Sequence, residues 1–260
     1  MIISNNEVHL WFVYNDKIHD PQLLSQYHSL LNHEESAQQK RFHFEKHRHQ
    51  YLLTRAMVRS VLSLYADEIK PENWEFKKNN YGKPFIGNSA LTLPLRFNIS
   101  HTDELIVMAV SLDQDVGVDV EYLPRLGKML DIASHFFSPS EVEALFDLPE
   151  SKQMNRFFDL WTLKEAYIKA CGMGLSIPLD HFSYSLSTHG KISIDFNVER
   201  NDQSEFWQFW QIHPNDIHKV AVALKADTSS LPFSISMYEA VPLFEVKPVN
   251  YAIAQGKVLS

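Results

Sequence analysis

Two long stretches of helical periodicity, each followed by strand-like segments, most constrain what this chain can fold into. Apolar residues recur at helical spacing over residues 47–65 and again over residues 154–170. Segments of alternating apolar residues, typical of half-buried strands, follow each stretch. They lie at residues 97–100, 105–111, 116–121, 182–186, 191–196, 206–212 and 220–224. This order predicts an α+β fold of two halves, each a small antiparallel sheet packed with one long helix.

The two halves are expected to meet just after Asp113, where the sequence Asp-Gln-Asp is the best candidate for a hinge. This boundary gives an N-terminal α+β half at residues 1–113 and a C-terminal α+β half at residues 114–226. Residues 227–260 contain three prolines and show weaker periodicity. We therefore interpret them as a C-terminal appendage without an assigned role.

Composition excludes several classes of protein. The net charge is −8 and the pI is about 5.9, whereas nucleic-acid binders usually show a basic excess. The N-terminus lacks the basic region of a secretory signal, and no apolar run approaches the ~20 residues that span a bilayer. Cys171 is the single cysteine, which excludes an internal disulfide and suits a reducing compartment. We expect a cytoplasmic protein with no nucleic-acid or membrane partner.

Carboxylates are concentrated in two motifs of the C-terminal half. Asp119 and Glu121 alternate in the sequence Val-Gly-Val-Asp-Val-Glu, so both project from one face of a predicted strand. Glu165 and Lys169 are four residues apart on one face of the second long helix. Taken alone, these features are compatible with a solvent-facing strand edge and an ordinary ion pair worth ~0.3–0.5 kcal/mol.

Glycines beside both acidic motifs favour a site. Gly117 permits close approach of another backbone to the acid-bearing strand, and Gly172 and Gly174 end the acid-bearing helix. Magnesium prefers oxygen ligands and commonly combines a few carboxylates with substrate phosphates. The joint pattern therefore predicts a magnesium site that takes a diphosphate-containing substrate.

Donors for a substrate phosphate are available in the N-terminal half. Ser100 and His101 end a predicted strand, and Lys83 lies in the turn Gly-Lys-Pro. A basic cluster over residues 40–59 stands out in an otherwise acidic chain. A solvated helix face explains this cluster equally well.

Four motifs, in order, resemble those of the Sfp-type 4′-phosphopantetheinyl transferases. They are Phe-Asn-Ile-Ser-His at 97–101, Val-Gly-Val-Asp-Val-Glu at 116–121, Phe-Phe-Ser-Pro-Ser-Glu at 136–141 and Trp-Thr-Leu-Lys-Glu-Ala-Tyr-Ile-Lys-Ala-Cys-Gly-Met-Gly-Leu at 161–175. The resemblance implies a pseudo-twofold monomer of two similar α+β halves, with coenzyme A and magnesium bound between them. The implied reaction transfers the 4′-phosphopantetheine arm of coenzyme A to a serine of an apo acyl or peptidyl carrier protein and releases 3′,5′-ADP.

The resemblance also implies roles for individual residues. Asp119, Glu121 and Glu165 are the implied magnesium ligands, and Ser100 and His101 are expected to meet the phosphates of coenzyme A. The turn Tyr81, Gly82, Lys83 and Pro84 is expected to line the adenine end. As a mechanistic hypothesis, Glu165 accepts the serine proton beside Asp119, and Lys169 binds and neutralises the leaving phosphate. Glu141 matches the acid of the third motif, but its position in a helix capping box is a sufficient explanation.

The region upstream of Arg41 departs from the family pattern. Some members carry lysines there that grip the nucleotide phosphates, whereas this chain has Glu35 and Gln38. Arg48 and Arg55 are the replacements suggested by charge and helix position.

Two alternatives belong to other classes of function. One is a non-catalytic module that binds coenzyme A or a carrier protein, and the other is an enzyme acting on a different magnesium-bound diphosphate. Plain ligand capture would not need the Glu165 and Lys169 pair, which therefore favours the transferase. The sequence does not indicate which carrier protein is served.

Overall fold

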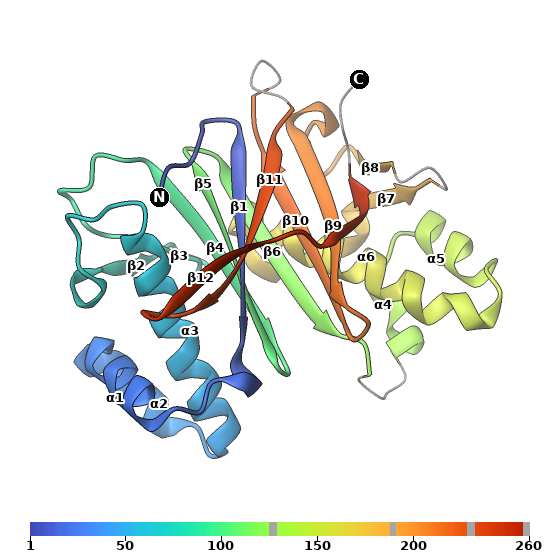
Figure 1. The fold of residues 1–260 in the computed structure, drawn as a ribbon. Coiled ribbons are helices and arrows are strands. Elements are labelled where there is room, and N and C mark those ends of the chain that lie inside the picture. Colours follow the sequence, from blue (N-terminus) through green and yellow to red (C-terminus); the bar gives the residue numbers. More distant parts are fainter. Residues whose placement is uncertain (125–128, 188–190, 228–231, 257–260) are drawn as a thin grey trace.

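The protein is represented by a computed structural model that describes residues 1–124, 129–187, 191–227 and 232–256, with side chains up to residue 253. Figure 1 shows two groups of helices on either side of a central region of strands. The elements of the N-terminal half are β1 (Glu7–Tyr14), α1 (Pro21–Leu30), α2 (His33–Arg41), α3 (Glu45–Ser63), β2 (Phe76–Lys78), β3 (Pro84–Ile86), β4 (Leu95–Thr102) and β5 (Leu105–Leu112).

The C-terminal half repeats the combination of strands with one long helix. Its elements are β6 (Asp115–Tyr122), α4 (Ala133–Phe136), α5 (Pro139–Phe146), α6 (Glu150–Cys171), β7 (Phe182–Leu186), β8 (Ile192–Phe196), β9 (Trp207–Asn215) and β10 (His218–Lys225). Three strands follow: β11 (Ser234–Val241), β12 (Glu245–Val249) and β13 (Ala252–Gly256). The predicted strands and both long helices are confirmed to within a few residues.

Two larger sheets form the centre of the molecule. The first has the strand order β12-β11-β1-β5-β4, and the second has the order β13-β9-β10-β6. Neighbouring strands are antiparallel except for β1 and β11, which run parallel. The expected α+β architecture of two halves is therefore confirmed, and the parallel pair is a departure from the purely antiparallel expectation.

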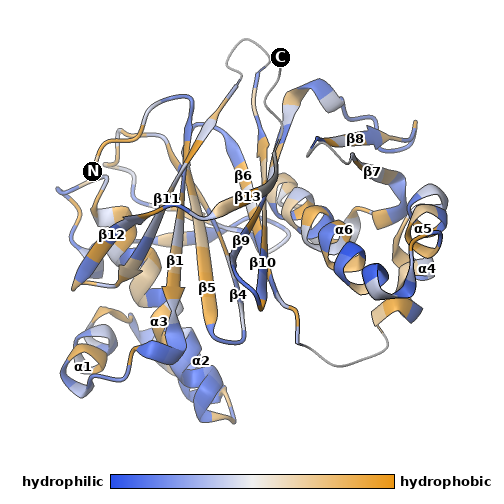
Figure 2. Cartoon of the chain, turned by 45° about the vertical axis from the view of Figure 1, so that its right-hand side comes forward, coloured by the Kyte–Doolittle hydropathy of each residue, from blue (hydrophilic) through white to orange (hydrophobic). Residues whose placement is uncertain are grey.

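The interior has three hydrophobic cores, because side chains along each strand point alternately to its two faces. In β1, Trp11 and Val13 pack under helix α3, whereas Leu10 and Phe12 face the second sheet. Apolar residues of β6, β9 and β10 complete this inter-sheet core, and α6 covers the outer face of the second sheet. Figure 2 shows strands such as β5 and β1 largely in hydrophobic colours. The order of layers is helices, sheet, sheet, helix.

The C-terminal stretch belongs to both sheets. Strand β11 pairs with β1 and β12 with β11, while β13 pairs with β9 of the second sheet. Between β12 and β13, the Tyr251 hydroxyl shares a hydrogen bond of 3.2 Å with the Tyr14 hydroxyl. These residues were interpreted from the sequence as an appendage, but they add strands to each half because their short alternating segments complete exposed sheet edges.

Helix ends follow the signals in the sequence. The Ser138 side chain accepts a hydrogen bond from the Glu141 backbone N–H, and the Glu141 carboxylate accepts one from the Ser138 backbone N–H, which completes a capping box at α5. Helix α6 ends at Gly172, whose φ of 67° is left-handed. In the described part of the chain, every helix is too short or too polar to cross a bilayer.

Candidate active site at the seam between the halves

Edge strands of the two sheets, β4 and β6, lie next to each other and form a seam between the halves (Figure 1). The Asn98 side-chain oxygen accepts a hydrogen bond of 2.9 Å from the Val118 backbone N–H. Further along, His218 Nε2 lies 2.8 Å from the Asp103 carbonyl oxygen. These contacts join the halves through side chains, because β4 and β6 belong to different sheets.

Helix α6 lies unusually close to β6 because Gly117 has no side chain. A Cβ atom at this position would lie 2.0 Å from the Ala166 carbonyl oxygen and 2.3 Å from the Ala170 nitrogen. Backbone atoms cannot yield to such a contact without a shift of the whole helix. Gly117 therefore sets the distance between the two acid-bearing elements, as its place in the sequence suggested.

Three polar side chains meet at the middle of the seam. The Lys169 ammonium donates to Asp119 Oδ1 over 2.6 Å and to Ser100 Oγ over 2.7 Å. Ser100 Oγ donates to Asp119 Oδ1 over 3.0 Å. Asp119 is 4% exposed, and no described residue donates to its other oxygen, Oδ2, which is buried. A buried carboxylate oxygen without a donor is costly, so Oδ2 marks a point where a ligand can bind.

Glu165 lies on α6 one turn before Lys169 and within electrostatic reach of Asp119. Burial raises its pKa above the ordinary value, the Asp119 carboxylate raises it further, and Lys169 acts in the opposite direction. Glu121 lies two residues after Asp119 on β6, opposite Lys219 of β10. The structure thus places Asp119, Glu165 and Lys169 near one another. The ligand set of Asp119, Glu121 and Glu165 stays a prediction.

The carboxylates can be compared with the needs of a magnesium ion. Among the described residues, no three His, Cys, Asp or Glu side chains are gathered as a metal site. Magnesium, however, is usually bound by one or two protein carboxylates together with substrate phosphates and water. Asp119, with its unpartnered Oδ2, and Glu165 fit that donor set.

Lys164 precedes Glu165 in sequence but points into the core of the C-terminal half. This fully buried lysine donates to Glu141 Oε2 over 2.8 Å and to two carbonyl oxygens of the 179–182 segment, each over 2.7 Å. Glu141 also accepts from the backbone N–H groups of Ser138 and Tyr184. Glu141 is therefore a structural acid, which agrees with its capping position, and it holds α6 in place.

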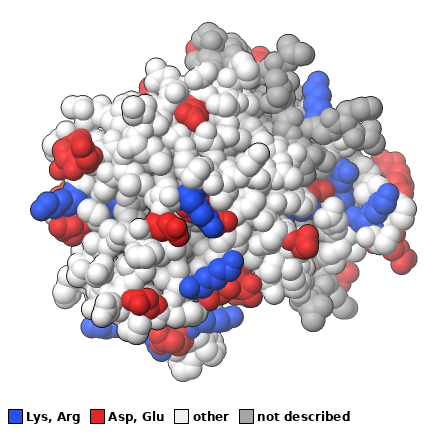
Figure 3. All heavy atoms as spheres, in the orientation of Figure 1, with Lys and Arg blue, Asp and Glu red and all other residues white. Residues whose placement is uncertain are grey.

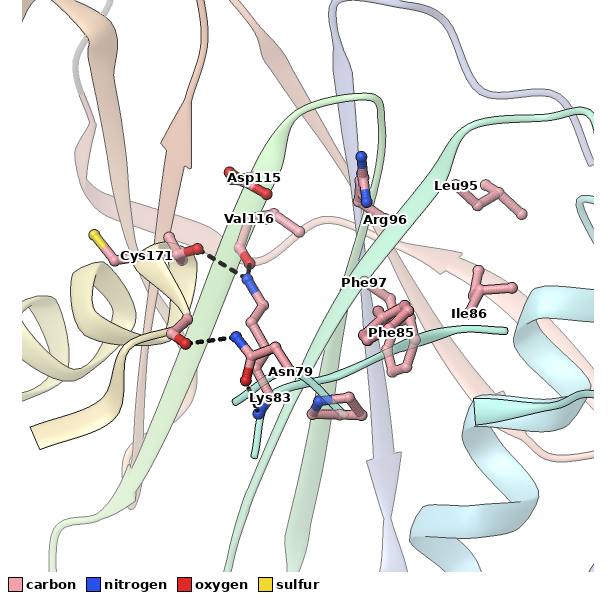
Figure 4. A pocket seen from close by; sticks show the side chains of 13 residues that line it. Asn79, Lys83, Phe85, Ile86, Leu95, Arg96, Phe97, Asp115, Val116 and Cys171 are labelled. Carbon is pink, nitrogen blue, oxygen red and sulfur yellow. Dashed lines mark hydrogen bonds between the residues drawn. The ribbon is translucent and has the colours of Figure 1, made fainter. Parts of the chain in front are cut away.

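The turn that follows β2 reaches across the seam to the end of α6 (Figure 4). Lys83 Nζ donates to the Ala170 carbonyl over 2.9 Å and to the Val116 carbonyl over 3.3 Å. Asn79 Nδ2 donates to the Gly172 carbonyl over 2.7 Å. Burial lowers the pKa of Lys83. Its contacts in this structure fasten the two halves together, and its predicted contact with coenzyme A stays a prediction.

Two cavities lie at opposite ends of the seam. One, of about 350 Å³, opens beside the first residues of β4 and β6, with Lys83 and Arg96 in its wall. The other, of about 600 Å³, opens beyond the last residues of the same strands, with His47, Gln50 and Tyr122 in its wall. Ser100 and Asp119 lie between the two cavities along the strands.

The other predicted binding residues lie on the N-terminal side of the seam. Tyr81 is exposed, and Gly82 adopts a φ of 91° in the same turn, two residues before Pro84. His101 follows Ser100 on β4 and is exposed. Desolvation of its ring and the Lys169 ammonium lower its pKa, which favours a neutral imidazole near pH 7.

The predicted nucleotide anchors are engaged within their own half. Arg48 donates to Glu45 and to the Phe42 carbonyl, while Arg55 forms an ion pair with the buried Glu35. Arg59 pairs with the same carboxylate over 2.8 Å. Burial alone would raise the pKa of Glu35, but the two guanidinium groups hold it below the ordinary value.

Asn79, Asn98 and Lys164 are not among the site residues that the sequence predicts. Lys164 stands beside Glu165 in the fourth motif, and Asn98 stands in the first, so their place within motifs was the available signal. Asn79 lies just before the Gly-Lys-Pro turn. Nothing in its local pattern indicates that it reaches the end of α6.

Comparison with known proteins agrees with this architecture. The family model described as "4′-phosphopantetheinyl transferase superfamily" matches residues 115–225, and the model described as "4′-phosphopantetheinyl transferase, N-terminal" matches residues 20–113. The chain is 30% identical over 224 residues to 4′-phosphopantetheinyl transferase HetI of Nostoc sp., covering 86% of this chain and 90% of that protein.

Two Bacillus subtilis proteins are similarly related. Identity to 4′-phosphopantetheinyl transferase Sfp is 33% over 187 residues, covering 72% of this chain and 80% of that protein. Identity to 4′-phosphopantetheinyl transferase ffp is 31% over 235 residues, covering 89% and 99%.

The two α+β halves and these matches together define the class as 4′-phosphopantetheinyl transferases. The chain belongs to the 4′-phosphopantetheinyl transferase family. The expected transfer of the coenzyme A arm to a carrier protein is confirmed at this level, and the alternative of a non-catalytic binding module is not favoured.

Proposed function

We propose that coenzyme A binds along the seam and that Asp119, Glu165 and Lys169 carry out the transfer, with one magnesium ion as cofactor. The observation that carries this proposal is the convergence of the two acids and the lysine beside Ser100. Each group comes from an element whose position is fixed by contacts across the seam. The diphosphate of coenzyme A is the part of the substrate that matches this polar centre.

In the proposed reaction, the carrier serine attacks the phosphorus that bears the pantetheine arm. The bond from the serine oxygen to phosphorus forms, the bond from phosphorus to the 3′,5′-ADP oxygen breaks, and the serine proton passes to Glu165. The raised pKa of Glu165 makes its carboxylate a stronger proton acceptor than an ordinary glutamate. Lys169 stabilises the charge that develops on the leaving phosphate.

Asp119 and Glu165, joined by Glu121, are the residues that would hold magnesium. When bound, the ion supplies electrostatic stabilisation of the diphosphate as the leaving group departs. Ser100 and the neutral His101 offer a hydroxyl and a ring nitrogen to the phosphates. Their place between the two cavities supports this role.

The turn 81–84 remains the proposed adenine contact because two of its residues, Lys83 and Pro84, lie in the wall of one cavity. Arg48 and Arg55 remain proposed nucleotide anchors, but each would have to release a present partner. The rearrangement is harder for Arg55 than for Arg48, because the partner of Arg55, Glu35, is buried. Exposed Lys46 in the second cavity can reach an anion with less rearrangement.

The acceptor is proposed to be an apo acyl or peptidyl carrier protein. Acidic and basic side chains are interspersed on the face drawn in Figure 3, and the net charge of −8 does not favour nucleic acid. A monomeric state and a cytoplasmic location remain proposals that follow from the sequence.

The proposal is tested by incubating the full chain with coenzyme A, Mg²⁺ and a panel of apo carrier proteins. We expect the intact mass of at least one carrier to increase by one phosphopantetheine arm, and addition of a chelator to abolish the gain. A control carrier with its acceptor serine changed to alanine should gain no mass. Transfer that continues undiminished in excess chelator would remove the metal from the proposal, and coenzyme A binding without any mass gain would contradict the catalytic assignment.

A further inference from the structure

Lys169 contacts a carboxylate that is also a proposed metal ligand. Its ammonium lies 2.6 Å from Asp119 Oδ1, and Ser100 adds a second donor to the same oxygen. Oδ2 of Asp119, by contrast, is buried and receives no hydrogen bond from any described residue. The lysine therefore neutralises the carboxylate without covering the oxygen that is free to bind a metal.

A divalent cation at Oδ2 and the ammonium at Oδ1 would be a few ångströms apart. They repel each other, because the two charges have the same sign and the site is largely removed from water. The metal can bind tightly only if Lys169 moves away or if an anion enters between them. The diphosphate of coenzyme A is such an anion, since it attracts both cations.

We infer that Lys169 is a counter-ion that weakens metal binding until coenzyme A arrives and that then turns toward the diphosphate. This inference rests on the proposed function and concerns the order in which the metal and coenzyme A bind. It adds to the catalytic role of Lys169 a second role, as the group that couples the two ligands. By linkage, the factor by which coenzyme A tightens metal binding equals the factor by which the metal tightens coenzyme A binding.

The geometry supports movement of the lysine more than movement of the acid. The Lys169 side chain is 27% exposed, whereas the Asp119 side chain is 6% exposed. Lysine has four rotatable side-chain bonds and donors that do not require one fixed orientation. Asp119 is held within β6, between the helix packed on Gly117 and the side-chain contact of Asn98 with Val118.

Binding of Mn²⁺ to the full chain without a carrier protein tests the inference, because no transfer can then occur. The free ion is followed by electron paramagnetic resonance in the presence and absence of coenzyme A. We expect Lys169→Met to bind Mn²⁺ roughly tenfold more tightly than wild type without coenzyme A, the order of effect expected when a nearby like charge is removed. Coenzyme A should tighten Mn²⁺ binding by a smaller factor in this variant than in wild type.

Three further variants make the result specific. Lys169→Gln gives a second neutral replacement if the methionine variant folds poorly, and circular dichroism checks both. Lys169→Arg keeps the charge and should not tighten Mn²⁺ binding. Lys152→Met removes an exposed lysine near the other end of α6 and controls for the change in net charge.

The outcomes separate this inference from the proposed function. If wild type binds Mn²⁺ with coenzyme A but neither neutral variant binds it more tightly without coenzyme A, the counter-ion role is wrong and the transfer proposal stands. If wild type binds no Mn²⁺ even with coenzyme A, the counter-ion role and the metal both fail, and the carrier mass assay independently decides whether transfer occurs.

Discussion

Two acid–lysine pairs connect helix α6 to its surroundings, and they differ in how completely the acid is satisfied. Glu141, paired with Lys164, receives hydrogen bonds on both carboxylate oxygens and is 3% exposed. Asp119, paired with Lys169, is almost equally buried, but only one of its oxygens has a donor among the described residues. The lysines differ too, because Lys164 is fully buried and Lys169 is partly exposed.

The difference separates a structural pair from the pair that we propose to be functional. A buried charge with all its hydrogen bonds made within the protein stabilises one conformation and leaves nothing for a ligand. A buried charge with an unused oxygen is costly in isolation and gains when a ligand arrives. Neighbouring residues of one helix, Lys164 and Glu165, thus meet different surroundings: Lys164 pairs with Glu141 in the core, and Glu165 lies near Asp119 and Lys169.

Removal of the Glu165 carboxylate should have the largest effect, and it should fall on activity. We expect Glu165→Gln to lower the turnover number by ~10²–10⁴-fold, the usual range for loss of a general base. Unfolding in urea should show no loss of stability, because burial and Asp119 already disfavour the charged form of Glu165. The measurement is carrier modification by mass spectrometry, with urea unfolding in parallel.

The matched control for this substitution is Glu150→Gln, which removes an exposed acid from the first turn of the same helix. It should transfer at the wild-type rate. A Glu165→Gln variant that also transferred at that rate would exclude Glu165 from the mechanism.

Removal of the Glu141 carboxylate, both of whose oxygens accept hydrogen bonds, should affect stability and not the chemical step. We expect Glu141→Gln to lower the free energy of unfolding by about 3–5 kcal/mol, the cost of leaving a buried charge without its partner. Lys164 would keep its two carbonyl acceptors but lose its counter-charge. Urea unfolding measures the loss. The control is Glu143→Gln, which removes an exposed acid from the same helix as Glu141, α5, and should change stability by no more than about 0.5 kcal/mol.

An equal stability for the Glu141→Gln variant and wild type would break the comparison. It would mean that hydrogen bonds to both carboxylate oxygens do not distinguish Glu141, as a structural acid, from Asp119, the proposed functional one. Reduced transfer in a variant that remains folded would, in turn, show that the Glu141 pair helps to position α6.

Local pattern was sufficient for the main elements and for the placement of the candidate site residues on them. Alternation placed Asp119 on a strand, and helical spacing placed Glu165 and Lys169 on one face, because both patterns depend on residues close in sequence. Contacts made across the seam were beyond such reasoning. Asn79 and Asn98 act on residues of the other half, and no local periodicity reports on a partner so distant in the chain.

The C-terminal strands show the same limit. Strand β11 joins β1, which lies more than 220 residues earlier, so its partner depends on the tertiary fold. Arg55 is a related case. Charge and helix position predict a nucleotide contact, but Glu35, which departs from the family pattern, lies beside Arg55 in space.

In the N-terminal half, the carboxylate of Glu35 pairs with both Arg55 and Arg59. Its replacement should have the smallest of the expected effects. We expect Glu35→Gln to lower the free energy of unfolding at pH 7 by about 1.5–3 kcal/mol, the range for hydrogen bonds to charged groups. Arg59 would keep the Trp74 carbonyl as an acceptor, over 2.9 Å, which limits the loss. The exposed Glu34 provides the control, since Glu34→Gln alters the same turn of α2 without touching the pair.

The pH dependence gives this last prediction its sign. Arg55 and Arg59 outweigh burial and hold the pKa of Glu35 below that of the unfolded chain, so the unfolded state takes up its proton first as pH falls. The contribution of Glu35 to stability is therefore complete above the ordinary glutamate pKa of ~4.3 and is lost as pH falls through the lower, folded value. Urea unfolding from pH 7 to pH 3 should show wild type and Glu35→Gln converging at the acid end. If the difference in free energy of unfolding between the two proteins stayed constant over this range, the charge of Glu35 would contribute nothing to stability. The effect of the substitution would then come from the shape of the side chain alone.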